Sequence, residues 1–486
     1  MRVLQVSAEL YPLLKTGGLA DVAGALPGAL DQAGADVRLL LPGFPALRES
    51  LVKECAVAPL ALPWGEGRAA LLRGQLAGLG DATVYLLDAP GLFERPGNPY
   101  ADEAGVPYAD NHRRFALLGL AAARLAEGID ASWLPQLVHA HDWHAALACA
   151  HLAASRARLR SRARSVYTVH NLAYQGLFPA PLFCELGLPP DQYAMDGLEF
   201  YGQVSFMKAG LHFADAITTV SPSYAREIQT PEQGCGLDGL LRHRAGDLHG
   251  ILNGVDYAVW SPAHDRSIAQ AYSLDRPEGK ADCKAALQRD CGLAVKPDAL
   301  LFGVVSRLTE QKGLPLVLQA LPDLLDAGGQ LVVLGSGDAR LDQAFAEAAA
   351  RHPGQVARRT GMDEGLAHRI YAGSDVVLVP SRFEPCGLTQ LYGLSYGTLP
   401  LVHRVGGLAD TVVDCTVEDL AAGLATGFVF DAFTVETYRR ALRRAFVLWS
   451  RPEDWAGVRR TAMQQHFGWD DAARRYVEVY RGVLCG

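Results

Sequence analysis

Short apolar runs alternate with helix-length amphipathic segments through the first half of the chain. The runs lie at residues 3–6, 37–41, 83–87, 137–141, 165–169 and 216–220. Apolar runs of this length between helical segments are typical of buried strands in stacked βαβ units. The pattern therefore predicts an open parallel sheet covered by helices, which is an α/β fold.

The pattern pauses between about residues 248 and 298, in a charged stretch with little periodicity, and then starts again. The second set of apolar runs lies at residues 300–306, 330–334, 356–358, 375–380 and 398–402, and from about Val435 the chain is helical. We expect two facing Rossmann-like domains with parallel sheets. The first comprises residues 1–248 and is rejoined by a C-terminal helix at 457–486, and the second comprises residues 249–456. A ligand would bind at the carboxyl ends of the strands, in an interdomain cleft.

Composition narrows the possible partners. The 486 residues carry 53 Asp and Glu against 45 Lys and Arg, a net charge of −8 that argues against nucleic acid as a partner. The nine cysteines form no Cys-x-x-Cys pair and are expected to be reduced thiols. No signal-peptide pattern or membrane-length apolar stretch is visible. We therefore expect a cytoplasmic protein without a membrane partner.

A glycine-containing loop follows the first apolar run and opens a helical segment. It reads Lys15-Thr16-Gly17-Gly18-Leu19-Ala20-Asp21. Backbone N–H groups at a helix start, together with a lysine, can hold a diphosphate. The spacing fits neither a Walker loop nor a dinucleotide fingerprint, and residues 335–340 match the latter only weakly. The alternative is a tight turn with a solvated lysine.

Histidines gather at the ends of two predicted strands. His139, His141 and His144 surround Asp142, and His170 and Asn171 end the next strand. Three roles are open for these residues, namely a metal site, a substrate-binding strand end and simple packing. The metal site is the least favoured, because Asp142 stands where it could be the N-cap of a helix and would leave His144 with an uncertain direction.

Two further strand ends carry charged side chains. Arg307 and Lys312 lie five residues apart after a strand and could grip a diphosphate, although Lys312 could instead pair with Glu310 on the surface. Glu384 lies between a strand and a helix start, where it could accept sugar hydroxyls or pair with Arg382. Residues 406–410 repeat the string Gly-Gly-Leu-Ala-Asp of residues 17–21, and the two loops would face each other across the cleft.

Together these motifs closely resemble the bacterial glycogen synthases and plant starch synthases, almost from end to end. The resemblance implies a retaining glucosyltransferase of the GT-B fold that needs no metal or other cofactor. Its partners would be ADP-glucose, or UDP-glucose in some members, and the non-reducing end of an α-1,4-glucan such as glycogen. The first domain would bind the acceptor and the second domain the donor.

The resemblance also implies roles for individual residues. Lys15, Gly18 and Asp21 would contact the sugar nucleotide, and Arg307 and Lys312 would clamp its diphosphate. His170, with Asn171 and Asn253 nearby, would border the anomeric carbon, and Tyr100 and Asp142 would contact sugar or acceptor. Glu384 would engage the donor glucose, below a helix start formed by Cys386, Gly387 and Leu388. The wider superfamily has a second glutamate eight positions after the first, where this chain has Tyr392.

The cationic residues of these motifs could stabilise the negative charge on a departing nucleoside diphosphate. Such a leaving group needs no acid to protonate it. Only Glu384 is a well-motivated carboxylate, whereas retaining hydrolysis uses two, so we favour front-face substitution. Three alternatives stay open, namely a sugar-nucleotide epimerase, a non-catalytic glucan-binding protein and a phosphorylase that uses pyridoxal phosphate. The sequence leaves the oligomeric state undetermined.

Overall fold

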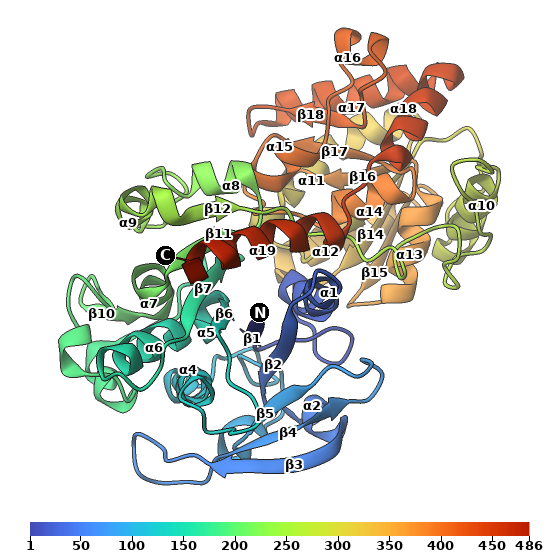
Figure 1. Cartoon of the computed structure of the whole chain (residues 1–486). Helices are drawn as coiled ribbons and strands as arrows, with labels where there is room; N and C mark the ends of the chain where they lie inside the picture. The colour runs from blue at the N-terminus through green and yellow to red at the C-terminus, as the bar shows by residue number, and fades with distance from the viewer. Residues whose placement is uncertain (486) are drawn as a thin grey trace. The chain divides into compact units, whose positions relative to one another are not determined.

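The computed structural model describes residues 1–485 and divides the chain into two compact units (Figure 1). The first comprises Met1–Gly254 and the segment from Trp469 onward, and the second comprises Val255–Gly468. Both boundaries lie later than the predicted 248 and 457. The first is later because β12 (Leu248–Gly250) adds a strand to the first sheet and Ile251 joins that unit's core. The second is later because α18 (Pro452–Gln464) packs Trp455, Val458 and Ala462 into the second unit's core.

The first unit is built on a nine-stranded sheet in the order β12-β11-β7-β6-β1-β2-β5-β4-β3. Besides β12, its strands are β1 (Arg2–Val6), β2 (Asp36–Pro42), β3 (Leu51–Pro59), β4 (Ala70–Leu76), β5 (Val84–Asp88), β6 (Leu137–His141), β7 (Arg164–Val169) and β11 (Ala216–Thr219). The strands from β12 to β5 are parallel, and β4 and β3 continue the sheet antiparallel. All six apolar runs of the first half are strands of this sheet, which confirms the α/β prediction.

Helices cover this sheet. They are α1 (Gly18–Gln32), α2 (Pro45–Glu49), α3 (Pro90–Phe93), α4 (Asn111–Ala126), α5 (Asp142–Ala145), α6 (Leu147–Ala157), α7 (Phe206–Phe213), α8 (Pro222–Glu227), α9 (Asp238–His243) and α19 (Trp469–Cys485). A small antiparallel sheet of β8 (Leu177–Pro179), β10 (Gln203–Ser205) and β9 (Glu199–Phe200) lies among the connections. Three 3-10 turns complete the unit, η1 (Ala180–Glu185), η2 (Pro190–Gln192) and η3 (Ala245–Asp247).

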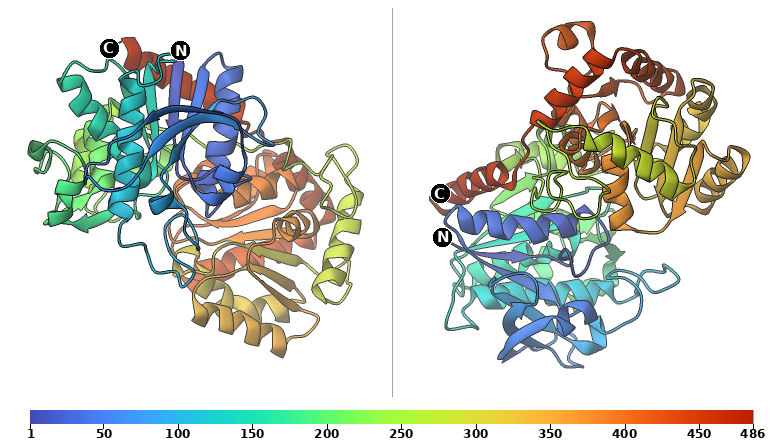
Figure 2. Two further views of the ribbon diagram at one scale, coloured as in Figure 1. Left: turned by 90° about the horizontal axis from the view of Figure 1, so that it is seen from below. Right: turned by 90° about the vertical axis from the view of Figure 1, so that its right-hand side faces the viewer.

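The helix α19 closes one side of the first unit's core. Its Trp469, Tyr476 and Tyr480 are buried with Val22 and Leu26 of α1. Figure 2 shows α19, in red, alongside α1, in blue, with the two chain ends close together. The first unit is therefore assembled from segments at opposite ends of the sequence.

The second unit contains a six-stranded parallel sheet in the order β15-β14-β13-β16-β17-β18. Its strands are β13 (Leu301–Val305), β14 (Gln330–Gly335), β15 (Val356–Thr360), β16 (Val376–Val379), β17 (Leu399–His403) and β18 (Phe428–Phe430). Besides α18, its helices are α10 (Gly279–Cys291), η4 (Glu310–Lys312), α11 (Leu314–Asp326), α12 (Ala339–Arg351), α13 (Glu364–Gly373), α14 (Thr389–Ser395), α15 (Gly406–Thr411), α16 (Val417–Ala421) and α17 (Val435–Trp449). The five predicted runs are all strands here, which confirms a second parallel sheet.

Strand order marks one edge of each sheet as a place for ligands. In the first sheet β1 lies between β2 and β6, and in the second β13 lies between β14 and β16. The direction of the connections reverses at these strands, and side chains after their carboxyl ends are free to surround a ligand.

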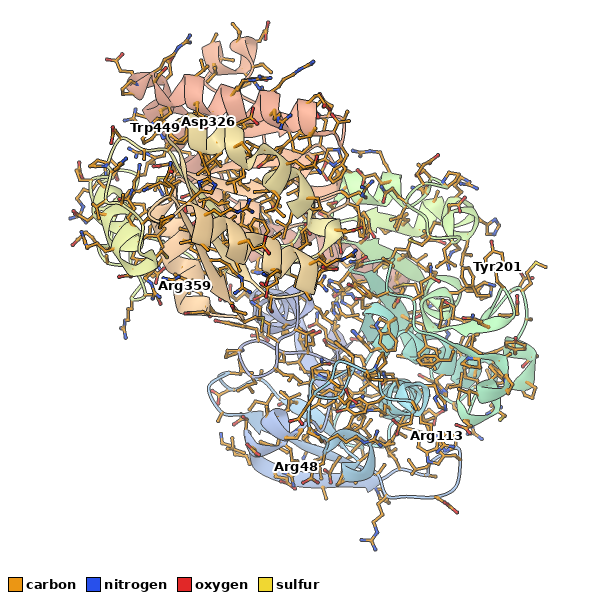
Figure 3. All side chains as sticks on the ribbon, turned by 180° about the vertical axis from the view of Figure 1, so that it is seen from behind. Arg48, Arg113, Tyr201, Asp326, Arg359 and Trp449 are labelled. Carbon is orange, nitrogen blue, oxygen red and sulfur yellow. The ribbon has the colours of Figure 1, made fainter. Side chains whose placement is uncertain are left out.

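Side chains fill the interior of each unit, whereas Tyr201 extends from the surface of the first unit and is 82% exposed (Figure 3). None of the helices within residues 1–485 has the length and apolar content of a membrane-spanning segment.

Candidate active site

Glu9 organises the segment that follows β1. Its carboxylate accepts hydrogen bonds from the backbone N–H groups of Thr16 at 2.7 Å and Gly17 at 3.2 Å, and from the Thr16 hydroxyl at 2.5 Å. The Tyr100 hydroxyl donates to the same carboxylate at 2.6 Å. Glu9 is buried, so these donors replace the water that the carboxylate loses on folding. The glycine-containing loop is thereby held in one conformation.

Sequence reasoning missed Glu9. The signal was present, because Ser7-Ala8-Glu9 directly follows the first apolar run and a carboxylate at a strand end is a candidate for a site.

Lys15 is paired within its own loop. Its Nζ atom lies 2.7 Å from Oδ1 of Asp21, in the first turn of α1, so Lys15 is an ion-paired lysine and not a freely solvated one. Gly17 precedes the helix and Gly18 is its first residue. A Cβ atom built on Gly17 would meet nothing within 4 Å, so the backbone there is open to an incoming group. A loop of this shape can receive an anion at the N-terminus of α1.

The histidines at the ends of β6 and β7 form a buried cluster. The rings of His139 and His141 are 4.1 Å apart, which confirms that they share one face of the strand. His139 bonds Tyr480 through Nδ1 at 2.7 Å and Thr168 through Nε2 at 2.6 Å. Nδ1 of His141 lies 3.0 Å from Nε2 of His170. Both ring nitrogens of His139 are thus already used by the protein, which favours a packing role for it.

Burial sets the charge of this cluster. It lowers the pKa of His139, His144 and His170 to about 3 and that of His141 well below its usual value, and neighbouring histidines lower it further for all but His170. All four rings are therefore neutral near pH 7. A neutral His170 can offer a hydrogen bond to a sugar without adding a positive charge.

Asp142 connects the ends of β6 and β7. Its Oδ1 accepts from the backbone N–H of His170 at 3.2 Å and that of Asn171 at 3.4 Å. It is the first residue of α5 and makes no cap, so the N-cap interpretation is wrong. Its φ of 60° is unusual for a residue with a side chain, and such strain is concentrated at functional sites. Burial raises the pKa of the Asp142 carboxyl to about 7.

Tyr100 links Glu9 to this cluster. Its ring stacks on that of His144 with centroids 5.1 Å apart, and its hydroxyl lies 3.1 Å from Nε2 of His144. Burial, reinforced by the Glu9 carboxylate, raises the pKa of the phenol. The structure thus brings together Tyr100, Asp142 and His170 at the carboxyl edge of the first sheet.

Glu384 and Lys312 form an ion pair in the second unit. Lys312 Nζ lies 2.6 Å from Glu384 Oε2, and the Ser381 hydroxyl donates to the same oxygen at 2.8 Å. The surface alternatives are therefore wrong, because Lys312 pairs with Glu384 and not Glu310, and Arg382 lies over the ring of Phe433. Within residues 1–485, Oε1 of Glu384 makes no hydrogen bond. The carboxylate is fixed through one oxygen and keeps the other for a ligand.

Glycines allow the close packing that positions this pair. A Cβ atom on Gly313 would lie 1.8 Å from the carbonyl oxygen of Pro380, and one on Gly406 would lie 1.9 Å from that of Glu384. Gly407 donates its N–H to that Glu384 carbonyl at 3.2 Å. The second Gly-Gly-Leu-Ala-Asp string therefore supports the backbone of Glu384, a role that its sequence alone did not predict.

Gly387 and its neighbours form the start of α14. Gly387 has a φ of 74°, and Leu388 is the N-cap residue. Gln390 donates to the carbonyl groups of Cys386 at 3.0 Å and Gly387 at 2.8 Å. These two bonds hold the turn before α14 in one conformation.

The other predicted residues lie at strand ends or beside them. Arg307 follows β13 and is exposed, and Asn171 accepts from Ala173 through its side chain at 3.1 Å. Asn253, after β12, is 6% exposed, and its Oδ1 has no hydrogen-bond partner in the described part of the chain. Tyr392 stacks on Trp260 with centroids 4.0 Å apart and is buried in the core. The residue in the position of the second glutamate thus packs inward.

Comparisons with known proteins show the class to which the chain belongs. Residues 2–243 match the family model described as the starch synthase catalytic domain, and residues 292–457 match the model described as glycosyl transferases group 1. Together with the two Rossmann-like units, these matches define a glycosyltransferase. The chain is 61% identical to the glycogen synthase of Variovorax paradoxus (strain S110), over 100% of this chain and 99% of that protein. The chain belongs to the glycogen synthase and starch synthase family.

Further relatives agree with this assignment. The glycogen synthase of Francisella tularensis subsp. novicida (strain U112) is 57% identical over 100% of this chain and 99% of its own length. Among solved structures, the catalytic domain of starch synthase IV from Arabidopsis thaliana, bound to ADP and acarbose, has a TM-score of 0.91 at 30% identity. That match covers 100% of this chain and 99% of the other chain.

Proposed function

We propose that this glycosyltransferase moves glucose from ADP-glucose to the non-reducing end of an α-1,4-glucan, with retention of configuration, in glycogen synthesis. The ion pair between Lys312 and Glu384 carries the proposal, because it combines a cation for a diphosphate with a carboxylate that has one oxygen free for a sugar hydroxyl. The full-length relationship to glycogen synthases and the ADP bound to the related starch synthase support the choice of substrates.

We assign the donor to the second unit and the acceptor to the first. Arg307 and Lys312 would bind the diphosphate, and Glu384 would accept hydrogen bonds from the donor glucose above Cys386, Gly387 and Leu388. Lys312 is bound to Glu384 in the free protein, and the diphosphate would share that cation. From the first unit, Lys15, Gly18 and Asp21 would contact the sugar nucleotide.

The residues of the first unit would position the sugars. His170, with Asn171 and Asn253, would border the anomeric carbon, and Tyr100 and Asp142 would contact sugar or acceptor. Because its pKa is lowered, His170 would act here as a neutral hydrogen-bonding group.

The chemistry follows from the leaving group. As the bond between C1 and the phosphate oxygen breaks, negative charge grows on the diphosphate, and Arg307 and Lys312 would stabilise it. The acceptor 4-hydroxyl would attack C1 from the same face, and the departing phosphate oxygen would take its proton. A C1–O4 bond forms, ADP leaves, and the configuration is retained. These cations would also allow the reaction to run without a metal ion.

Release of nucleoside diphosphate tests the proposal. Purified protein is incubated with glycogen and either ADP-glucose or UDP-glucose, and ADP and UDP are measured. We expect ADP release that depends on glycogen, together with a longer α-1,4-linked product. A preference for UDP-glucose would show that the proposed donor is wrong. Release of free nucleotide without acceptor would favour an epimerase.

Variants of Glu384 separate the proposed site from a general effect on folding. Glu384→Gln keeps the shape of the side chain but loses its charge, and Glu384→Ala loses the shape and the charge. We expect the turnover of each variant to be lower by several orders of magnitude, because the charge favours the developing oxocarbenium ion. Glu418→Gln changes an exposed carboxylate of the same unit and is the matched control. Normal turnover in folded Glu384→Ala would remove Glu384 from the active site.

A further inference from the structure

Five arginines alternate with other residues between α6 and β7, at positions 156, 158, 160, 162 and 164. The two outer ones share a single carboxylate, because Arg156 and Arg164 both bind Asp215, at 2.5 and 3.1 Å. The three inner ones are exposed, and their side chains make no hydrogen bond or ion pair within residues 1–485. The nearby Glu127 is paired with Arg124. The three inner arginines therefore place uncompensated positive charge on the surface of a chain whose net charge is −8.

The loop has a defined structure. Two hydrogen bonds close the end of α6, from the N–H of Leu159 to Arg156 O at 2.9 Å and from the N–H of Arg160 to Ser155 O at 3.0 Å. This is the Schellman arrangement, in which the residue in the position of Leu159 is left-handed and usually glycine. The Ser161 hydroxyl ties the loop to Ala126 O at 2.9 Å. The arginines are thus presented by a fixed backbone.

Leu159 is unusual in both its backbone conformation and its exposure. It has a φ of 56° and is 93% exposed. A left-handed backbone conformation destabilises a leucine relative to a glycine, because the leucine has a Cβ atom. The exposed leucine side chain gains no stability from burial in return. Arginines near the end of α6 could be explained by the helix dipole, but an exposed leucine in a left-handed turn could not. Backbone strain of this kind is a reason to look for a function.

We propose that residues 158–162 form a docking surface for an acidic polypeptide segment that places an apolar side chain on Leu159. Arginine is enriched in protein interfaces and pairs with carboxylates through its planar fork. A phosphate polymer would use the charges but not the leucine, and a neutral glucan would not use the charges. The observations therefore favour a protein partner.

The surface lies away from the candidate active site. Arg164 begins β7, so this loop precedes the amino end of the strand, whereas His170 follows its carboxyl end (α6 and β7 in Figure 1). A partner bound here would leave the sheet edge with Asp142 and His170 accessible. It would tether the enzyme without blocking its reaction, which extends the function beyond glucosyl transfer.

A labelled synthetic peptide of glutamates interspersed with leucines tests the surface, measured by fluorescence anisotropy. A second peptide has serine in place of each leucine. We expect the leucine peptide to bind more tightly and to weaken in high salt. Changing Arg158, Arg160 and Arg162 to Gln should weaken it at least about tenfold. The same change at the exposed Arg440, Arg443 and Arg460 of the second unit is the control.

Leu159→Gly separates docking from folding. It should weaken the leucine peptide but not the serine peptide, and raise Tm by about 2–4 °C because the strain is relieved. Turnover should be unchanged in all loop variants. The proposal is overturned if neither peptide binds, if the two peptides bind alike, or if the control variant weakens binding equally. Polyphosphate binding as tight as that of the leucine peptide, or self-association that the loop variants abolish, would also overturn it.

Discussion

Replacing Asp142 with Asn should make the first unit more stable, and increasingly so as the pH rises. The carboxyl is buried, and burial raises its pKa from 3.8 to about 7. Asn cannot ionise, but its Oδ1 can still accept from the N–H groups of His170 and Asn171, as the carboxylate does. The substitution therefore removes a titration while keeping the contacts.

The magnitude follows from the difference between the two pKa values. About three pKa units correspond to about 4 kcal/mol. Because the folded-state pKa is the higher one, the protonated acid contributes stability that is fully present below about pH 4 and is lost as the pH rises through about 7. Relative to the parent, Asp142→Asn should gain about 4 kcal/mol over this range, of which about 2–3 kcal/mol falls between pH 5 and pH 8.

Urea unfolding followed by tryptophan fluorescence, at several pH values from 5 to 8, measures this gain. Asp130→Asn is the matched control, because hydrogen bonds and Arg73 lower the pKa of that buried Asp130 carboxyl to about 2, so its effect should be constant over the same range. Asp142→Ala leaves two N–H groups without an acceptor and should be destabilised by about 1–3 kcal/mol. A stability difference between parent and Asp142→Asn that does not change with pH would refute the reasoning.

Four further predictions concern catalysis and stability. Lys312→Ala should lower kcat by about 10²–10³ with a smaller change in KM, and a raised KM with normal kcat would make Lys312 a ground-state binder. Gly406→Ala should abolish turnover in a folded protein, because its Cβ would lie 1.9 Å from Glu384 O, whereas Gly457→Ala, with nothing within 4 Å, should not. The first unit should lose stability as the pH falls from about 6.5 towards 3, because the buried histidines take up protons only when unfolded, and flat urea midpoints would contradict this. Chelation with EDTA should leave the rate unchanged, and activity restored by Mg²⁺ would return the histidine cluster to consideration as a metal site.

The parallel sheets were predictable because buried strands are short, continuous apolar runs, and all eleven runs are strands. The hairpin of β3 and β4 was not predicted, because the edge strand Leu51–Pro59 is mostly exposed and shows no regular alternation of buried and exposed residues. The unit boundaries were predicted only approximately, since the assignment of residues 251–254 and 457–468 to a unit depends on packing partners that are distant in sequence.

The candidate site was predictable where a motif places a charged residue at a strand end, as for Lys312 and Glu384. Sequence could not show that these two bind each other, because a contact across 72 positions depends on the packing of Gly313 and Gly406. Nor could it show the direction of Asp142, which turns towards the end of β7 because of its positive φ. Local patterns predict elements, while the pairing of side chains needs the tertiary structure.

The return of the chain to the first unit has a consequence for biosynthesis. A ribosome makes residues 1–254 first, yet the core of that unit lacks Trp469, Tyr476 and Tyr480 until the whole second unit has been made. During this interval the faces of Val22 and Leu26 that α19 covers remain without their final partner. The second unit is continuous in sequence and can close first. The first unit, although it is made first, can therefore complete its core only after α19 has been made, and it exposes apolar surface until then.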